Sequence, residues 1–300
     1  GAQNVPLYAT LSEKDYAYIL NHSDAKYCFV SNNELYEKVK AVVSKTQLKN
    51  IFSLEDLQTD YSWNSFLNLG NTKDYSSEIT ALKNEIKPND LATIIYTSGT
   101  TGTPKGVMLS HKNIVSTVFK TSKRLNLSKE NLRIISYLPI SHIFERTASY
   151  YNIYKGFQVY FAESIEQIGD TIREVKPHYL AIVPRLLEKI FDKIVDKGSQ
   201  PRLIRVFTAA GIPVFEGYGM TESSPGGTLN DVRNNGLKIG SVGKPLEGIT
   251  IKIAEDGEIL MKGDNIMLGY YKNEALTAET IVNGFLHTGD IGEIDKDGFL

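Results

Sequence analysis

Residues 91–125 read LATIIYTSGTTGTPKGVMLSHKNIVSTVFKTSKRL, and this stretch decides the fold class. Residues 91–97 form a short apolar run that is typical of a buried strand, and residues 111–125 carry apolar positions at helical spacing. A loop rich in glycine and threonine lies between them. Strands that alternate with helices in this way indicate an α/β protein with a parallel sheet.

The same alternation extends over most of the chain. Helices are expected at 11–22, 32–45, 77–86, 141–156, 165–176 and 184–198, and strands at 25–30, 50–54, 133–138, 157–162 and 178–183. This rhythm predicts parallel, helix-covered sheets. From residue 236 onward, short alternating runs are separated by Gly, Pro, Asp-Gly and Glu-Gly, which predicts a small antiparallel β subdomain. We therefore expect an α/β portion over residues 1–235 and a β-rich subdomain over 236–300.

The composition excludes several classes of protein. The 300 residues contain 33 Lys+Arg and 35 Asp+Glu, and a net charge of −2 gives no reason to expect an electrostatic nucleic-acid binder. The single cysteine, Cys28, cannot form an intrachain disulfide and excludes a cysteine-rich zinc site. No apolar run reaches the roughly 18 residues of a membrane span, and the first residues lack a signal-peptide pattern. These features favour a reducing, cytoplasmic setting.

Residues 96–106, YTSGTTGTPKG, have the composition of a phosphate-binding loop. Glycines let backbone N–H groups approach an anion closely, hydroxyls add donors, and a lysine adds positive charge. The standard P-loop is disfavoured, because Thr103 and Pro104 separate Gly102 from Lys105. The residues expected to bind nucleotide phosphate here are Thr97, Ser98, Gly99, Thr100, Thr101, Gly102 and Lys105.

The stretch TSGTTGTPKGV resembles the phosphate-loop signature of the adenylate-forming superfamily, which comprises acyl-CoA synthetases, luciferases and peptide-synthetase adenylation domains. Two further motifs follow in the order of that family. GYGMTES (217–223) resembles its adenine and magnesium motif, and HTGD (287–290) resembles its ribose motif. Residues 137–163 and 175–194 are most similar to the long-chain fatty acid:CoA ligases.

The resemblance implies a role for each residue of these motifs. Tyr218 would stack on adenine, and Asp290 would accept hydrogen bonds from the ribose hydroxyls. Thr221 would donate to the α-phosphate, and Glu222 would be the ligand of Mg²⁺. With Lys105, Thr221 and Glu222 are the expected catalytic residues. No protein nucleophile is required, because the substrate carboxylate attacks the α-phosphorus.

His142 has two interpretations. A histidine at the start of a helix is commonly a cap or a satisfied buried group. In the resembling family, the aromatic or histidine residue of this motif lies beside the acyl and α-phosphate site, which would make His142 a substrate-proximal residue.

The resemblance implies the activity of a long-chain fatty acid:CoA ligase, with ATP, Mg²⁺ and coenzyme A. A fatty acid would be converted to acyl-adenylate and then acyl-CoA, releasing pyrophosphate and AMP. The alternatives are a fatty acyl-AMP ligase, an acyl-carrier-protein synthetase and a non-catalytic nucleotide-binding fragment. An apolar substrate is compatible with peripheral membrane association, and homodimers occur in the family. Compared with the family, we expect the chain to be incomplete at its start and near residues 198–200, and to lack the small C-terminal domain.

Overall fold

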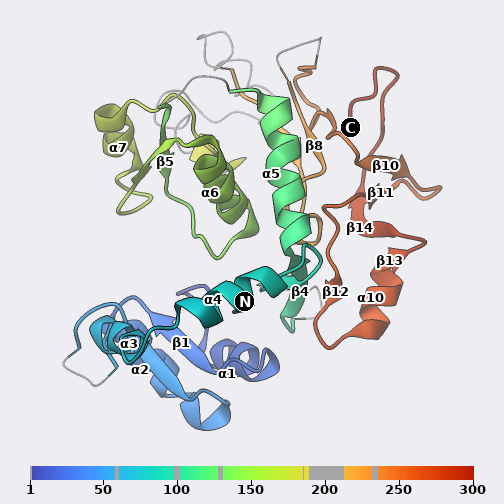
Figure 1. The fold of residues 1–300 in the computed structure, drawn as a ribbon. Helices are drawn as coiled ribbons and strands as arrows, with labels where there is room; N and C mark the ends of the chain where they lie inside the picture. Colours follow the sequence, from blue (N-terminus) through green and yellow to red (C-terminus); the bar gives the residue numbers. More distant parts are fainter. Residues whose placement is uncertain are drawn as a thin grey trace. The chain divides into compact units, whose positions relative to one another are not determined.

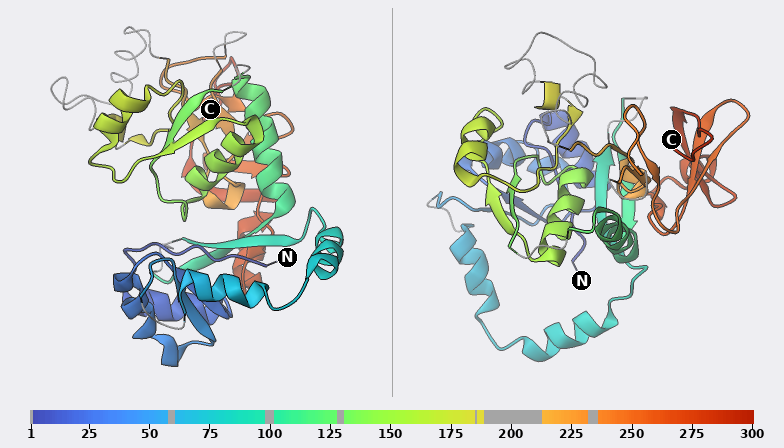
Figure 2. Two further views of the ribbon diagram at one scale, coloured as in Figure 1. Left: turned by 60° about the vertical axis from the view of Figure 1, so that its left-hand side comes forward. Right: turned by 90° about the horizontal axis from the view of Figure 1, so that it is seen from above.

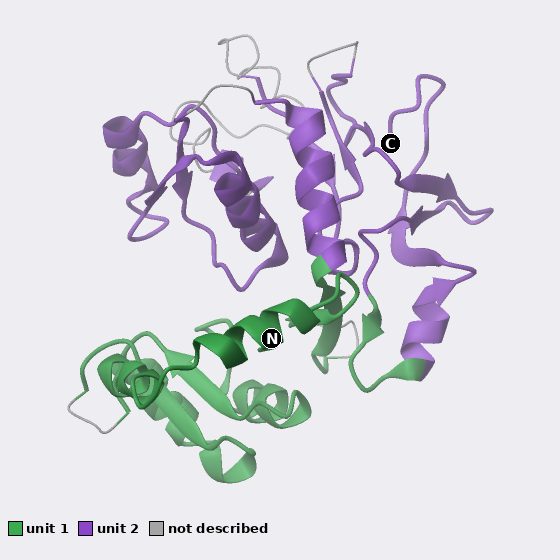
Figure 3. Cartoon of the chain, in the orientation of Figure 1, with its two compact units in different colours: residues 1–111, 268–274 green, residues 112–267, 275–300 purple. Residues whose placement is uncertain are grey.

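The computed structural model describes residues 2–57, 61–97, 102–127, 131–184, 186–188, 213–231 and 236–300 (Figure 1). The chain divides into two compact units (Figure 3). Unit 1 comprises residues 1–111 and 268–274, and unit 2 comprises residues 112–267 and 275–300. The segment 268–274 thus belongs to the first unit although it comes from far along the sequence.

Unit 1 begins with helices whose starts are fixed by side-chain caps. The Ser12 hydroxyl accepts a hydrogen bond from the Asp15 amide at 3.2 Å, and the Asn32 side chain accepts one from the Leu35 amide at 3.0 Å. The predicted helices at 11–22 and 32–45 are therefore confirmed. The described elements of the unit are α1 (Glu13–His22), β1 (Tyr27–Val30), α2 (Asn33–Lys40), the 3₁₀ helix η1 (Val43–Lys45), β2 (Asn50–Ser53), α3 (Trp63–Gly70), α4 (Ser76–Glu85), β3 (Leu91–Thr97), β4 (Lys105–Ser110) and β12 (Gly269–Tyr270).

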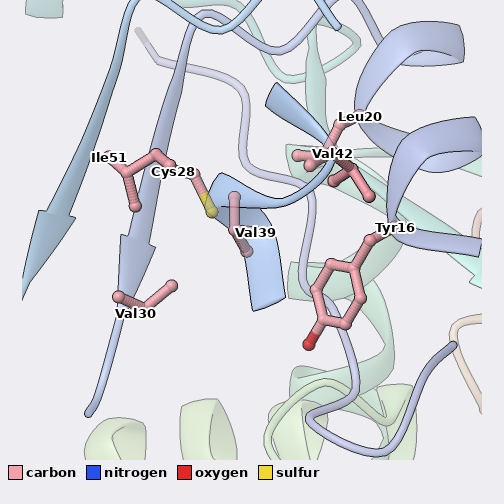
Figure 4. Packing of buried hydrophobic residues seen from close by; sticks show 7 residues of the cluster. All are labelled: Tyr16, Leu20, Cys28, Val30, Val39, Val42 and Ile51. Carbon is pink, nitrogen blue, oxygen red and sulfur yellow. The ribbon is translucent and has the colours of Figure 1, made fainter. Parts of the chain in front are cut away.

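Strands β1 and β2 pair in parallel, with Cys28 opposite Ile51. Residues from α1, β1, α2 and β2 form one apolar core (Figure 4). Its buried members are Tyr16, Leu20, Cys28, Val30, Val39, Val42 and Ile51. The parallel pair and its helical cover confirm the predicted architecture of this part.

The hairpin that follows differs from the prediction. Residues 105–110, expected in a loop, form strand β4, which pairs antiparallel with both β3 and β12. Val107 and Leu109 alternate into the core and are fully buried, which gives this short run the burial pattern of a strand. Helix α3 was also not predicted, whereas the helix expected at 77–86 is present as α4.

In the α/β part of unit 2, helices and strands follow one another in the expected order. Strands β5 and β6 pair in parallel, with Ile134 opposite Val159. The strand expected at 178–183 is reduced to one bridge between Ile134 and Tyr179. Residues 184 and 186–188 are helical, and the rest of the helix expected at 184–198 lies outside the described residues. The elements are α5 (His111–Leu125), which starts at the end of unit 1, β5 (Arg133–Ser136), α6 (Ile143–Lys155), β6 (Gln158–Phe161) and α7 (Ile168–Val175).

The second half of unit 2 is mainly antiparallel β-structure, as predicted. A four-stranded sheet has the order β10–β11–β14–β13, seen from two further directions in orange and red in Figure 2. Met261 and Leu286 lie opposite each other on β11 and β14 and are fully buried. The elements are β7 (Gly217–Tyr218), the 3₁₀ helix η2 (Thr221–Ser223), β8 (Thr228–Leu229), β9 (Lys244–Pro245), β10 (Thr250–Ile253), β11 (Glu258–Lys262), α10 (Glu274–Thr280), β13 (Ile281–Val282) and β14 (Phe285–Ile291).

None of the described helices is long and apolar enough to span a lipid bilayer.

Candidate active site

Two of the predicted motifs meet in unit 2. Tyr218 ends the short strand β7, and Asp290 lies near the end of β14. The Tyr218 hydroxyl donates a 2.6 Å hydrogen bond to Asp290 Oδ2. Burial raises the pKa of the Tyr218 phenol, and its hydrogen bond to the Asp290 carboxylate raises it further. The phenol therefore stays protonated at neutral pH and remains a donor to the carboxylate.

A second carboxylate holds the HTGD stretch in place. His287 Nδ1 lies 2.7 Å from Glu258 Oε2, and the Gly289 amide donates to Glu258 Oε1 at 2.8 Å. Gly289 adopts φ +75°, which a residue with a side chain rarely adopts. Glu258 thus fixes the backbone just before Asp290. Sequence reasoning gave Glu258 no role, because its partners lie on the neighbouring strand.

The turn that follows β7 carries Thr221 and Glu222. Residues 220–226 form this turn, the Glu222 turn. A Cβ added at Gly219 would lie 1.5 Å from the Pro225 carbonyl oxygen, so this position requires glycine. The Ser223 hydroxyl accepts from the Met220 amide at 2.9 Å and donates to the Met220 carbonyl at 3.1 Å. The turn is therefore compact and held by its own side chains.

The donor set at Glu222 fits Mg²⁺ that is shared with a nucleotide. Glu222 is 7% exposed, and one carboxylate with nucleotide phosphates and water is a common environment for this ion. A group of three or more His, Cys, Asp or Glu side chains able to enclose a metal is not found among the described residues. Binding of Mg²⁺ at Glu222 stays a prediction.

The ends of the predicted phosphate loop are placed by the β3–β4 hairpin in unit 1. Thr97 and Lys105 are register partners at the loop end of the hairpin, and Gly102 adopts φ +81°. Ser98, Gly99, Thr100 and Thr101 lie outside the described residues. The hairpin thus brings two predicted phosphate-binding residues side by side.

The Lys105 ammonium lies over an aromatic ring. Its Nζ is 5.7 Å from the centroid of Tyr270, a distance at which the negative face of the ring attracts a cation. Tyr270 is 7% exposed and pairs with Val107 of β4. Sequence reasoning did not identify Tyr270, which lies far from Lys105 along the chain.

A polar cluster lies beneath the hairpin in unit 1. The His22 Nδ1 and the Tyr96 hydroxyl are 2.7 Å apart. Asp24 accepts hydrogen bonds from Tyr271 at 3.0 Å and from Lys272 at 2.6 Å. Burial lowers the pKa of His22, and the nearby Lys272 charge lowers it further. The cluster ties α1 to the residue that precedes Thr97.

His142 caps a helix, which is the first of the two interpretations given for it. It is the N-cap of α6, and its Nδ1 accepts a hydrogen bond from the Phe144 amide at 3.1 Å. Desolvation by its surroundings lowers its pKa. Its proximity to substrate stays a prediction.

Known proteins that are similar to this chain agree with the resemblance that its motifs indicate. A family model described as AMP-binding enzyme matches residues 1–271. Long chain acyl-CoA synthetase 3 of Arabidopsis thaliana is 29% identical over 392 residues, which cover 100% of this chain and 58% of that protein. The chain therefore spans somewhat more than half the length of this curated relative.

Solved structures share the fold at low sequence identity. A fatty acyl CoA synthetase of Mycobacterium tuberculosis superposes with a TM-score of 0.80 at 22% identity, covering 100% of this chain and 62% of that one. The o-succinylbenzoate coenzyme A synthetase of Bacillus subtilis, solved in complex with ATP and magnesium ion, gives a TM-score of 0.78 at 23% identity, covering 99% and 63%. At these identities the likeness establishes the fold alone.

Proposed function

The chain belongs to the AMP-binding enzyme family, and from this premise we propose that its protein activates a fatty acid with ATP and Mg²⁺. The product is an acyl-adenylate, which coenzyme A then converts to acyl-CoA. The observation that carries the proposal is the hydrogen bond between Tyr218 and Asp290. It joins the expected adenine and ribose motifs at one place in the fold. The relatives named long-chain acyl-CoA synthetases support a fatty acid as the substrate.

The nucleoside half of ATP would lie against Tyr218 and Asp290. The phenolic ring offers a flat face for adenine, and the Asp290 carboxylate, exposed beside it, can accept hydrogen bonds from ribose hydroxyls. Because the Tyr218 hydroxyl already donates to Oδ2, the carboxylate is held in orientation before the nucleotide arrives.

The phosphates would be bound in unit 2 by the Glu222 turn, where Thr221 offers a hydroxyl to the α-phosphate. Mg²⁺ bound through Glu222 would neutralise phosphate charge. An oxygen of the fatty acid carboxylate then forms a bond to the α-phosphorus, while the bond from that phosphorus to pyrophosphate breaks. In the second step, the coenzyme A sulfur forms the thioester bond to the acyl carbon, and AMP leaves.

Product identification tests this proposal. The purified protein is incubated with ATP, Mg²⁺ and palmitate, with and without coenzyme A, and the products are identified by mass spectrometry. We expect palmitoyl-AMP without coenzyme A, and palmitoyl-CoA with AMP when it is present. Palmitoyl-AMP that persists with coenzyme A would instead indicate an acyl-AMP ligase or a carrier-protein synthetase. Bound ATP without any product would indicate a non-catalytic nucleotide-binding protein.

Two matched variants assign the chemistry to the Glu222 turn. Glu222→Gln keeps the shape of the side chain but removes its charge, so product formation should be lost. Glu247→Gln removes a carboxylate whose ion pair with Lys123, at 2.9 Å, is exposed to solvent. Such pairs contribute little, and this variant should retain activity. Equal activity in both variants would refute the role proposed for Glu222.

A further inference from the structure

Asn265 is a buried amide in the loop between β11 and β12, outside the three motifs. Its side chain is fully buried in unit 2. Desolvation of an amide without a hydrogen bond is unfavourable, and among the described residues the Nδ2 of Asn265 finds acceptors whereas its Oδ1 accepts no hydrogen bond. Its contacts therefore indicate what the residue does.

The Asn265 amide nitrogen is directed at the backbone of the Glu222 turn. Nδ2 donates to the Ser223 carbonyl at 3.2 Å and also to the Gly226 carbonyl. The Gly226 amide in turn donates to the Ser223 carbonyl at 2.8 Å. The Asn265 side chain thus holds Ser223 and Gly226, which are the two ends of the stretch that follows Glu222.

A second contact from the same segment reaches Glu222 itself. The Met267 amide donates to the Glu222 carbonyl at 2.8 Å. The segment is anchored in turn by α5, where Asn113 Nδ2 donates to the carbonyls of Asp264 at 2.8 Å and Ile266 at 2.7 Å. The donors that hold the Glu222 turn are therefore themselves fixed.

The Glu222 turn needs such support because its backbone is unusual. Ser224, within the turn, adopts the left-handed conformation at φ +59°, which is unfavourable for a residue with a side chain. A conformation of this kind persists where the surrounding contacts determine it. The hydrogen bonds from Asn265 on either side of Ser224 supply that constraint.

We infer that Asn265 is a positioning residue that holds the Glu222 turn in the shape in which Glu222 binds Mg²⁺ with ATP. The inference rests on the proposed function, since the role of Glu222 in binding Mg²⁺ is itself proposed. It adds a fully buried residue that acts through the backbone carbonyls of Ser223 and Gly226.

The test is the gain in ATP affinity that Mg²⁺ produces, measured by titration calorimetry on the full chain with and without the ion. Asn265→Asp keeps the size of the side chain but places an acceptor oxygen opposite two carbonyls. We expect this variant to lose about tenfold or more of the Mg²⁺-dependent gain, as is typical when a residue supporting a metal ligand is changed. Glu222→Gln should lose the gain, and adding Asn265→Asp to it should change nothing further.

Asn230→Asp is the matched control. Asn230 is also fully buried in unit 2, and its Nδ2 donates to the Ser241 carbonyl at 2.9 Å, away from the Glu222 turn. This control should lower the thermal unfolding temperature but keep the Mg²⁺-dependent gain. If Asn265→Asp does not fold, Asn265→Ser, which keeps one donor, takes its place with the same expectation of a reduced gain.

Two outcomes would overturn the inference alone. In the first, the Asn265 variant keeps the full Mg²⁺-dependent gain in ATP affinity of the wild type. In the second, the Asn265 and Asn230 variants lose this gain equally. A wild-type protein that does not bind ATP would refute the proposed function first, and the inference with it. The two failures are therefore distinguishable.

Discussion

Tyr218 donates its phenolic hydrogen to Asp290 over 2.6 Å, although 72 residues separate the two in the chain. One residue offers a flat ring and the other a carboxylate, and the hydrogen bond fixes their relative orientation. This pairing is the basis for proposing that adenine and ribose bind in unit 2.

Removal of the Tyr218 hydroxyl should weaken nucleotide binding modestly. Tyr218→Phe keeps the ring but leaves Asp290 without its donor, so ATP affinity should fall about three- to tenfold, the usual effect of one hydrogen bond. Tyr218→Ala also removes the stacking face and should cost more. Titration calorimetry with ATP measures both. Unchanged affinity in Tyr218→Ala would contradict the placement of adenine here.

The ring beneath Lys105 should contribute through its π face. Tyr270→Leu removes that face and should lower the ATP affinity about two- to fivefold. Phe285→Leu is the matched control, because Phe285 lies beneath Lys252 and Lys262, which have no proposed nucleotide role. Equal effects in the Tyr270→Leu and Phe285→Leu variants would show that the loss is not specific to Lys105.

Replacement of Glu145 should stabilise the protein at neutral pH. Burial raises the pKa of this carboxyl, which accepts a hydrogen bond from the Ser136 hydroxyl. The favourable contribution of Glu145 to the free energy of unfolding is therefore complete below the unfolded-state pKa of about 4.3. It is lost as the pH rises through the folded-state pKa. Glu145→Gln can still accept from Ser136 and carries no charge. Its free energy of unfolding, measured with urea, should exceed that of wild type at pH 7, and the difference should shrink towards pH 4. A difference that grows in acid would contradict this assignment.

The single thiol should react only when the protein unfolds. Burial raises the pKa of Cys28 to about 11, and the side chain is 8% exposed in the core of unit 1. At pH 8 about one thiol in a thousand is ionised, and the thiolate is the reactive form. Labelling with Ellman's reagent should therefore be slow in the native protein and rapid in urea. Equally rapid labelling in both states would show that the core around α1, β1 and β2 is open.

The helices and parallel strands could be predicted because their signals are local. Ser12 and Asn32 cap the first two helices next to apolar positions at helical spacing, so the helix starts are visible in a few adjacent letters. Roles for the motif residues Tyr218 and Glu222 could be proposed because the short stretches around them resemble motifs of the adenylate-forming family.

The residues that support the site could not be predicted, because their roles depend on distant partners. Strand β4 pairs with β12, which comes from residues 269–270. Asn265 acts on carbonyls 42 and 39 residues earlier, and Glu258 holds Gly289 from 31 residues away. A buried amide or carboxylate has no periodic signal, so only the folded chain shows what it binds.

Fatty-acid-dependent exchange of pyrophosphate into ATP tests the central claim most directly. The purified protein is given ATP, Mg²⁺ and labelled pyrophosphate with acetate, octanoate or palmitate, and Glu222→Gln serves as the inactive control. We predict exchange that requires the fatty acid, is strongest with palmitate and is abolished by Glu222→Gln. Absence of exchange with every acid, in a protein that binds ATP, would contradict the proposal that this protein activates fatty acids as adenylates.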